Sequence, residues 1–460
     1  MSLYNELREK YDEFCYHAYD ITREENEMLI RYHFEAKGLS EFTPTWRFDL
    51  SGCDFGSLMN NKTFLNLVFS LGMVELVSYW KIACPKRVKI HAGSLSDEQI
   101  AWWKDLYFHG LGEFFYTNGI ELDSEGFMEI VSLGEEPKGV EYPLNNAKGC
   151  LVPIGGGKDS VVSVELLRSI GEDAKCYIIN PRGATVNTTK AGYFPKEDVI
   201  VAKRTLDKRM IELNKQGFLN GHTPFSAIVA FSATIAAYLK GLRYIVLSNE
   251  ASANESTVLG STVNHQYSKS FKFENDFHEY EEAYLKTGTY YFSLLRPLSE
   301  FQIARYFAKC TAYHDIFRSC NVGSKEDIWC GHCPKCMFVF FILSPFLSYA
   351  RLCEIFGADM VNDASMIPVM EQLVGVVEEK PFECVGSRDE VNTAICMTIG
   401  QYEKRGEELP VLLKHYKTLK QYEEYRNRKN EFFTGYEEEN LLPEKFATLV
   451  RENCCMEADS

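Results

Sequence analysis

The chain is short of positive charge and of long apolar runs. Its 49 Lys and Arg residues are outnumbered by 65 Asp and Glu residues, and the formal net charge of −16 argues against a broad nucleic-acid-binding surface. The longest apolar run, residues 337–350, is too short for a membrane span and contains Pro345. The first residues, MSLYNELREKYDEF, lack the apolar stretch of a secretory signal. These absences predict a cytoplasmic protein that binds neither nucleic acid nor membrane.

The composition is otherwise that of a globular protein with a large core. Hydrophobic residues make up 45% of the 460 residues and charged residues 25%, which are ordinary proportions. Fifteen cysteines, an odd number, indicate a reducing compartment. The length predicts about three domains.

The most informative stretch is GCLVPIGGGKDSVVSVELLRSI, residues 149–170. An apolar run, residues 151–154, is typical of a buried strand, and Val162, Leu166 and Ile170 follow at helical spacing. Gly171 stands where a left-handed helix cap is expected. The stretch therefore predicts a strand, a glycine loop and the start of a helix.

Such a loop favours phosphate because the first amides of a helix have no internal partner and glycines allow close approach of the backbone. Asp159 follows Lys158, so the loop is not a Walker A motif. It resembles the SGGxDS loop of the PP-loop ATP pyrophosphatases, with Gly155 in place of the first serine. The resemblance implies ATP binding by Gly155, Gly156, Gly157, Lys158, Asp159 and Ser160, with Mg²⁺ held by Asp159. The alternative is a tight turn without a ligand.

The pattern of elements predicts an α/β fold in three units. A mixed α+β N-terminal domain covers residues 1–145, a PP-loop (HUP-type) domain with a parallel sheet covers 146–345, and a mostly helical region covers 346–460. The first unit holds a buried helix or helix pair at 64–85, hinged near Gly72. Strands are expected at 175–180, 198–203 and 243–248, with a helix at 225–240 and a disordered end at 452–460.

Polar segments follow the predicted strands, where ligands of parallel sheets bind. Asn180 and Glu250 are candidates for the nucleotide and its Mg²⁺. Arg182, Asn249, Asn254, Lys269 and Arg388 are candidates for the substrate. A solvated loop with Asn capping would explain residues 249–256 equally, a surface loop would explain Lys269, and a helix-capping turn at Ser387 or Asp389 would explain residues 380–391.

Four cysteines, Cys320, Cys330, Cys333 and Cys336, lie in CNVGSKEDIWCGHCPKC. Four thiolates at this spacing can close a tetrahedral Zn²⁺ site with a structural role. An iron–sulfur cluster, free or redox cysteines, and His332 as a substitute ligand remain alternatives. A PP-loop enzyme that makes 7-cyano-7-deazaguanine has a similar element.

Several stretches together resemble one family, the ATP-dependent UDP-N-acetylmuramoyl-L-alanyl-L-glutamate epimerases of bacterial peptidoglycan synthesis. They are LGMVELVSYWK, EFFYTNG, PIGGGKDS, GHTPFSAI, NEASANES, VNHQYSKSF, CGHCPKC and PFECVGS, from about residue 71 to residue 387. The resemblance implies that a UDP-linked muramoyl dipeptide is the substrate and that its terminal L-Glu is adenylated and inverted, with release of AMP and pyrophosphate.

The implied reaction needs an acid–base pair, for which His222, His265 and Cys384 are the candidates beside Asp159. Two other functions stay open at this point: a PP-loop ligase or thiolase acting on a purine or tRNA base, and a non-catalytic ATP-binding module. The sequence does not indicate whether the protein is a monomer or an oligomer.

Overall fold

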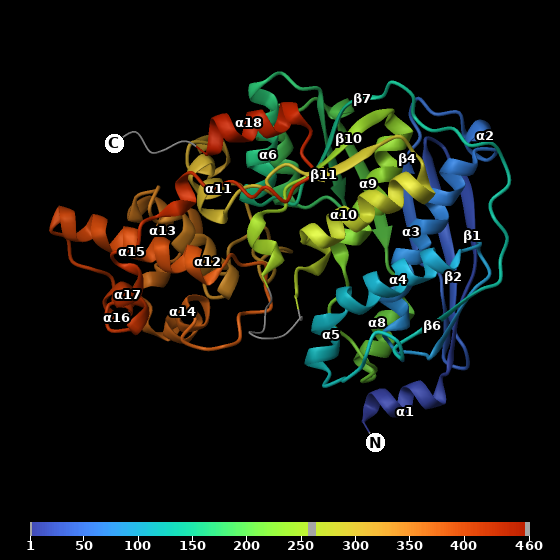
Figure 1. The fold of residues 1–460 in the computed structure, drawn as a ribbon, viewed down its shortest axis with the longest axis horizontal. Helices are drawn as coiled ribbons and strands as arrows, with labels where there is room; N and C mark the ends of the chain where they lie inside the picture. Colours follow the sequence, from blue (N-terminus) through green and yellow to red (C-terminus); the bar gives the residue numbers. More distant parts are fainter. Residues whose placement is uncertain (1, 256–263, 456–460) are drawn as a thin grey trace.

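The computed structural model describes residues 2–255 and 264–455. An 11-stranded mixed sheet runs through its middle, in the order β11-β10-β7-β8-β9-β4-β2-β1-β5-β6, with β3 paired to β2 (Figure 1). The strands are β1 (Glu13–Glu24), β2 (Glu27–Ala36), β3 (Ser40–Phe42), β4 (Thr45–Asp49), β5 (Arg87–Ile90), β6 (Glu129–Ser132), β7 (Lys148–Pro153), β8 (Ala174–Ile179), β9 (Val199–Thr205), β10 (Leu242–Leu247) and β11 (Tyr290–Ser293). The mixed α/β architecture is confirmed.

Helices cover both faces of the parallel half of the sheet, and the C-terminal helices pack together in a core that is continuous with one of these faces. They are α1 (Leu3–Lys10), α2 (Phe55–Leu58), α3 (Lys62–Trp80), α4 (Asp97–Gly110), α5 (Gly112–Thr117), α6 (Lys158–Ser169), α7 (Gly183–Ala191), α8 (Lys208–Lys215), α9 (Phe225–Lys240), α10 (Phe271–Tyr280), α11 (Glu300–Phe307), α12 (Pro334–Leu343), α13 (Tyr349–Phe356), α14 (Ile367–Val374), α15 (Arg388–Arg405), α16 (Val411–Tyr416), α17 (Lys420–Tyr425) and α18 (Glu444–Cys454). The helices from α12 to α17, orange to red, lie opposite the blue N-terminal strands in Figure 1.

The parallel half of the sheet is doubly wound around β7. The chain runs from β7 outward through β8 to β9, then returns to the other side of β7 with β10 and β11, and these five strands are parallel. The direction of winding therefore reverses at β7. In open α/β sheets, ligands bind beyond the carboxyl end of the strands at such a point.

Side chains along β7 alternate between two cores. Leu151 packs in the core that contains α3 and α9, whereas Cys150 and Val152 pack in the core that contains α6, α11 and α12. Both faces are thus covered, which explains why the strand reads as a continuous apolar run.

The sheet continues without a break from the parallel half into the N-terminal strands. β9 pairs antiparallel with β4, and β4 pairs with β2. A buried ion pair ties the helix layer to this seam: Arg204 of β9 donates to Glu75 of α3 at 2.8 Å, and Trp46 of β4 donates to the same carboxylate at 3.1 Å. Glu75 is fully buried.

We expect Glu75→Gln to lower the free energy of unfolding by about 3 kcal/mol, because the change leaves the Arg204 cation, whose side chain is only 11% exposed, without its partner. Chemical denaturation measures this. Glu212→Gln, which removes an exposed pair with Arg209, is the control and should cost less than about 1 kcal/mol. An equal effect of both changes would contradict the structural role given to Glu75.

Helix α3 is the one described helix that is long and apolar enough to cross a membrane, and 89% of its apolar window is buried inside the protein. It is a single helix without a hinge at Gly72. A Cβ atom there would lie 2.1 Å from the Tyr16 hydroxyl, so this glycine permits close packing against β1.

The strands predicted at 175–180, 198–203 and 243–248 and the helix at 225–240 are confirmed. Two further expectations are wrong. Ile170 lies beyond the end of α6 and is 47% exposed. Residues 452–454 belong to α18, which is held by the buried side chains of Phe446, Leu449 and Val450; residues 456–460 lie outside the described part, as do Ser256 and Val263 of the two predicted polar segments.

Candidate active site

The predicted glycine loop joins β7 to α6 at the point where the sheet winding reverses. Gly156 has a φ of +85°, and a Cβ atom on it would lie 2.8 Å from the Cβ of Ala184. Gly157 is the N-cap of α6 and provides no side-chain hydrogen bond to the helix. Gly155 is exposed, and a Cβ atom added to it would have no other atom within 4 Å. The helix start is therefore uncapped by side chains and open on its Gly155 side, as an anion site requires.

Lys158 and Glu300 are buried behind the loop and form a charge cluster with the partly exposed Asp159. The Lys158 ammonium donates to the carboxylates of both Asp159 and Glu300. Burial raises the pKa of Glu300 to about 7 despite the opposing charge of Lys158. Burial alone would raise the pKa of Asp159 as well, but Lys158 and Lys335 outweigh it, so this carboxyl stays ionised. Ser160 caps locally by donating to Gly157 O at 3.1 Å.

The ends of β10 and β11 add a second carboxylate to this region. Asn249, directly after β10, donates to Ser293 of β11 at 3.0 Å. Glu250 follows and is 4% exposed. Burial raises the pKa of Glu250, Lys269 lowers it and Asp159 raises it. Glu250 therefore interacts electrostatically with both Asp159 of the loop and the candidate substrate-binding Lys269.

Two candidate acid–base groups, His222 and His265, meet at Glu113 of α5. His265 Nδ1 is hydrogen-bonded to Glu113 Oε2, and His222 Nδ1 lies 3.5 Å from the same oxygen. The two imidazole centroids are 4.5 Å apart. Burial and the neighbouring His265 lower the pKa of His222 to about 4, so this ring is neutral at pH 7.

Cys384 lies on the other side of His265. The Lys269 ammonium contacts its Sγ at 3.2 Å, and His265 hydrogen-bonds to the same sulfur. Burial alone would raise the pKa of this thiol, but Lys269, His265 and Lys335 lower it to about 6. Burial likewise opposes the charged form of His265, whereas Cys384 and Glu113 raise its pKa to about 9. At neutral pH the pair is therefore a thiolate and an imidazolium.

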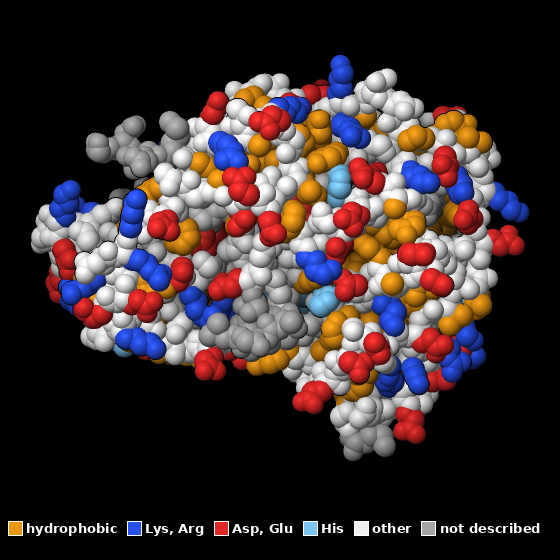
Figure 2. All heavy atoms as spheres, viewed as in Figure 1, with side chains coloured by type: hydrophobic (Ala, Val, Ile, Leu, Met, Phe, Trp, Pro, Cys, Tyr) orange, Lys and Arg blue, Asp and Glu red, His pale blue; other side chains and the backbone are white. Residues whose placement is uncertain are grey.

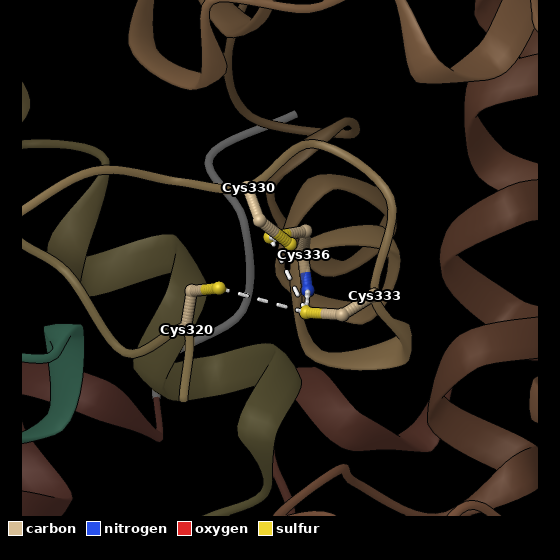
Figure 3. Close-up of side chains that lie close together, drawn as sticks. All are labelled: Cys320, Cys330, Cys333 and Cys336. Atoms are coloured by element: carbon tan, nitrogen blue, oxygen red, sulfur yellow. Dashed lines mark hydrogen bonds between the residues drawn. The ribbon is translucent and has the colours of Figure 1, made fainter. Parts of the chain in front are cut away.

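The four cysteines gather as the spacing predicts (Figure 3). Their sulfur atoms all lie within 4.8 Å of one another; Cys320 and Cys333 are 3.7 Å apart, Cys330 and Cys336 3.7 Å, and Cys333 and Cys336 3.5 Å. A tetrahedral ion with bonds of about 2.3 Å to sulfur separates its ligands by roughly 3.8 Å. Backbone amides of Gly323 and Cys336 donate to two of the sulfurs, as outer partners of thiolate ligands do. The residues fit Zn²⁺, which stays a prediction.

We expect Cys333→Ser to lower zinc content and the free energy of unfolding together, the latter by more than about 2 kcal/mol, because structural zinc binding contributes to folding. Elemental analysis and denaturation measure the two quantities. Cys310→Ser, at a partly buried cysteine outside the cluster, should change neither. A wild-type protein that is stable and free of metal would remove the zinc site.

Four other candidate residues have different surroundings. Asn180 exchanges two hydrogen bonds with the backbone of Arg204, and Asn254 accepts from the Phe271 amide; both have structural roles at the start or edge of an element. Arg388 donates to Glu378 O and braces its own turn, where Ser387 is the N-cap of α15. Arg182 is exposed at the start of α7.

Some residues near the cluster carry no local sequence signal. Glu300 and Lys335 reach the region from α11 and α12, and Glu113 reaches it from α5. Of these, only Glu113 lies in an aromatic stretch of the sequence, residues 100–119, where a buried polar side chain needs a partner. A cavity of about 800 Å³ lies elsewhere, among α12, α13, α15 and α16, and no predicted site residue lines it.

The structure is that of an α/β protein with a glycine loop at the point where the sheet winding reverses and a cluster of titratable side chains beside it. The family model described as "MurL N-terminal domain" matches residues 5–294, and the family model described as "MurL C-terminal domain" matches residues 316–430. The chain belongs to the MurL epimerase family.

Curated relatives support this membership. Proteins of Xanthomonas oryzae pv. oryzae, Salinispora tropica and Micromonospora sp. are 37%, 34% and 35% identical to it, over 72%, 85% and 87% of this chain and 74%, 86% and 90% of their own lengths. Each is named UDP-N-acetyl-alpha-D-muramoyl-L-alanyl-L-glutamate epimerase.

Proposed function

We propose that this protein is an ATP-dependent epimerase that inverts the terminal L-Glu of UDP-MurNAc-L-Ala-L-Glu through an acyl-adenylate, releasing AMP and pyrophosphate. The observation that carries the proposal is the contact of Cys384 with Lys269 and His265, close to the carboxylates behind the glycine loop. The names of the relatives supply the substrate.

Adenylation solves the central difficulty of the reaction. The α-proton of a carboxylate is hard to remove, because the anion must accept a second negative charge. Transfer of AMP to the carboxylate oxygen makes the carbonyl neutral, and its α-proton becomes far more acidic. Each 1.36 kcal/mol removed from the barrier is a factor of about ten in rate.

The uncapped start of α6 and the glycine loop fit the phosphates of ATP, and Asp159 and Glu250 are carboxylates of the type that holds Mg²⁺. When bound, Mg²⁺ supplies charge neutralisation on the phosphates. Lys158 keeps Asp159 ionised and oriented by direct contact.

Proton transfer is assigned to the Cys384–His265 pair. An α-carbon that enters between the sulfur and the imidazole, in place of their mutual hydrogen bond, would have a thiolate base on one side and a proton donor on the other, as inversion requires. Glu113 orients His265 through its hydrogen bond to Nδ1. Neutral His222 accepts a proton from the Cys384–His265 pair or donates one to it. The Lys269 ammonium is placed to stabilise negative charge beside the sulfur.

The pH–rate profile should be bell-shaped. Activity rises as Cys384 deprotonates near pH 6 and falls as His265 deprotonates near pH 9. Lys269→Met removes the cation that lowers the thiol pKa, so the acidic limb should move up toward about 8.5, the ordinary value for a thiol. An acidic limb that stays in place in this variant would contradict the role given to Lys269.

The test of the proposal is incubation with ATP, Mg²⁺ and UDP-MurNAc-L-Ala-L-Glu, followed by assay of pyrophosphate, AMP and D-Glu. We expect pyrophosphate release that depends on the dipeptide substrate. Release that depends instead on a purine or a tRNA would favour a PP-loop ligase or thiolase, and nucleotide binding without turnover would favour a non-catalytic module.

A further inference from the structure

The four-cysteine element touches the glycine loop at one end. The backbone amide of Arg318 donates to Gly156 O at 2.7 Å, and the Cβ of Ser319 lies 3.2 Å from the place where a Cβ on Gly157 would stand. Cys320, the first cysteine of the cluster, follows directly. A shift of Cys320 would therefore be transmitted to the loop within two residues.

The other end of the element places Lys335. Cys333 is the N-cap of α12 and Cys336 lies in its first turn, with Lys335 between them. Successive residues of a helix point about 100° apart. The side chains of Cys333 and Cys336, three positions apart, therefore lie on one face of α12, and Lys335 points in another direction. Its ammonium donates to Cys384 O, and the residue is only 6% exposed.

The surroundings of Lys335 differ from those of Lys158. Lys158 contacts two carboxylates, whereas no carboxylate oxygen lies within 4.0 Å of the Lys335 ammonium among residues 2–255 and 264–455. The Glu383 carboxyl is a neighbour: burial raises its pKa and Lys335 opposes that rise, but the two side chains form no ion pair. An ammonium has three donors, and the backbone oxygen of Cys384 accepts from one. The charge of Lys335 nevertheless reaches Asp159 in the first turn of α6, since it lowers the pKa of that carboxyl. A buried ammonium with donors to spare is suited to an anion that binds beside Asp159.

We propose that Lys335 is a further binding residue for the polyphosphate chain of the nucleotide, and that the metal-holding cysteine element sets its position together with that of the glycine loop. The inference rests on the proposed use of ATP. It gives the cysteine cluster a function at the active site beyond local stability.

The test is the affinity of the full-length protein for a non-hydrolysable ATP analogue with Mg²⁺, and for pyrophosphate, measured by calorimetry. Lys335→Gln should bind both about 10–100-fold more weakly, with unchanged zinc content and thermal stability. Lys325→Gln, at an exposed lysine of the same element, is the control and should bind as the wild type does. Affinity of Lys335→Gln within twofold of the wild type would overturn the inference and leave the proposed function standing. A wild-type protein that binds no ATP would overturn both.

Hydrogen exchange tests the second part. When a chelator removes the metal, amides of residues 154–160 should exchange at least about tenfold faster, while those of the distant β1–β2 hairpin keep their rates. Unchanged exchange at residues 154–160 after metal loss would show that the element does not hold the loop.

Discussion

Replacing Cys384 by serine is expected to lower the rate of epimerisation by about 10²- to 10⁴-fold, the usual contribution of a general acid or base. The serine hydroxyl remains protonated at neutral pH, so the thiolate that faces His265 and Lys269 is lost. Pyrophosphate release should persist, because Cys384 acts after adenylation. Chiral analysis of hydrolysed product and a pyrophosphate assay measure the two steps separately.

Cys396→Ser is the matched control, since Cys396 is a partly buried cysteine in α15 near the Tyr416 hydroxyl. It should retain wild-type rates for both steps. If the Cys384 variant epimerises at more than about a tenth of the wild-type rate, the thiolate is not the base and the assignment fails.

Asp159→Asn is expected to lower pyrophosphate release by about 10³-fold, with little change in stability. The amide cannot hold Mg²⁺ as a carboxylate does, and loss of preorganised charge at a transferring phosphate costs rate on this scale. The fold should survive because Lys158 keeps its contact with Glu300. Stopped-time assays of pyrophosphate and thermal unfolding measure the two effects.

Asp173→Asn is the control for this change, because Asp173 lies at the opposite end of the sheet, before β8. It should release pyrophosphate at the wild-type rate. Near-normal pyrophosphate release by the Asp159 variant would contradict a magnesium-binding role for this residue. Glu250 and Glu300 would then be the candidates for that role.

Those parts of the site that lie within one short stretch were predictable from the sequence. The glycine loop is such a case, since a strand, three glycines and a helix start follow one another within about ten residues. The cysteine cluster is another, because three of its four members recur every third residue in one turn. In both cases the physical requirement, an uncapped helix or a tetrahedral set of sulfurs, is met by neighbours in the chain.

Contacts between distant segments were not predictable. Glu113 is 152 residues from His265, and Lys269 is 115 residues from Cys384, so no spacing rule connects them. Asn180 is a further example. Its place after a strand suggested a ligand, and no spacing rule indicated that its side chain also exchanges hydrogen bonds with the backbone of Arg204 on the neighbouring strand.

The continuity of the sheet is likewise a property of the folded chain. The edge of β9 pairs with β4 through residues about 155 positions apart, such as Phe48 and Ala202. The net charge of the protein follows from the sequence, but the distribution of charged side chains over its surface does not. On the face drawn in Figure 2, Lys and Arg side chains are scattered among Asp and Glu and form no continuous stripe.

The most direct test of the central claim is the reaction in deuterium oxide with ATP, Mg²⁺ and UDP-MurNAc-L-Ala-L-Glu, followed by mass spectrometry and chiral analysis of the terminal residue. The account predicts D-Glu that carries one solvent deuterium at its α-carbon, formed only when ATP is present and accompanied by pyrophosphate. D-Glu formed without ATP, or without solvent deuterium at that carbon, would contradict it.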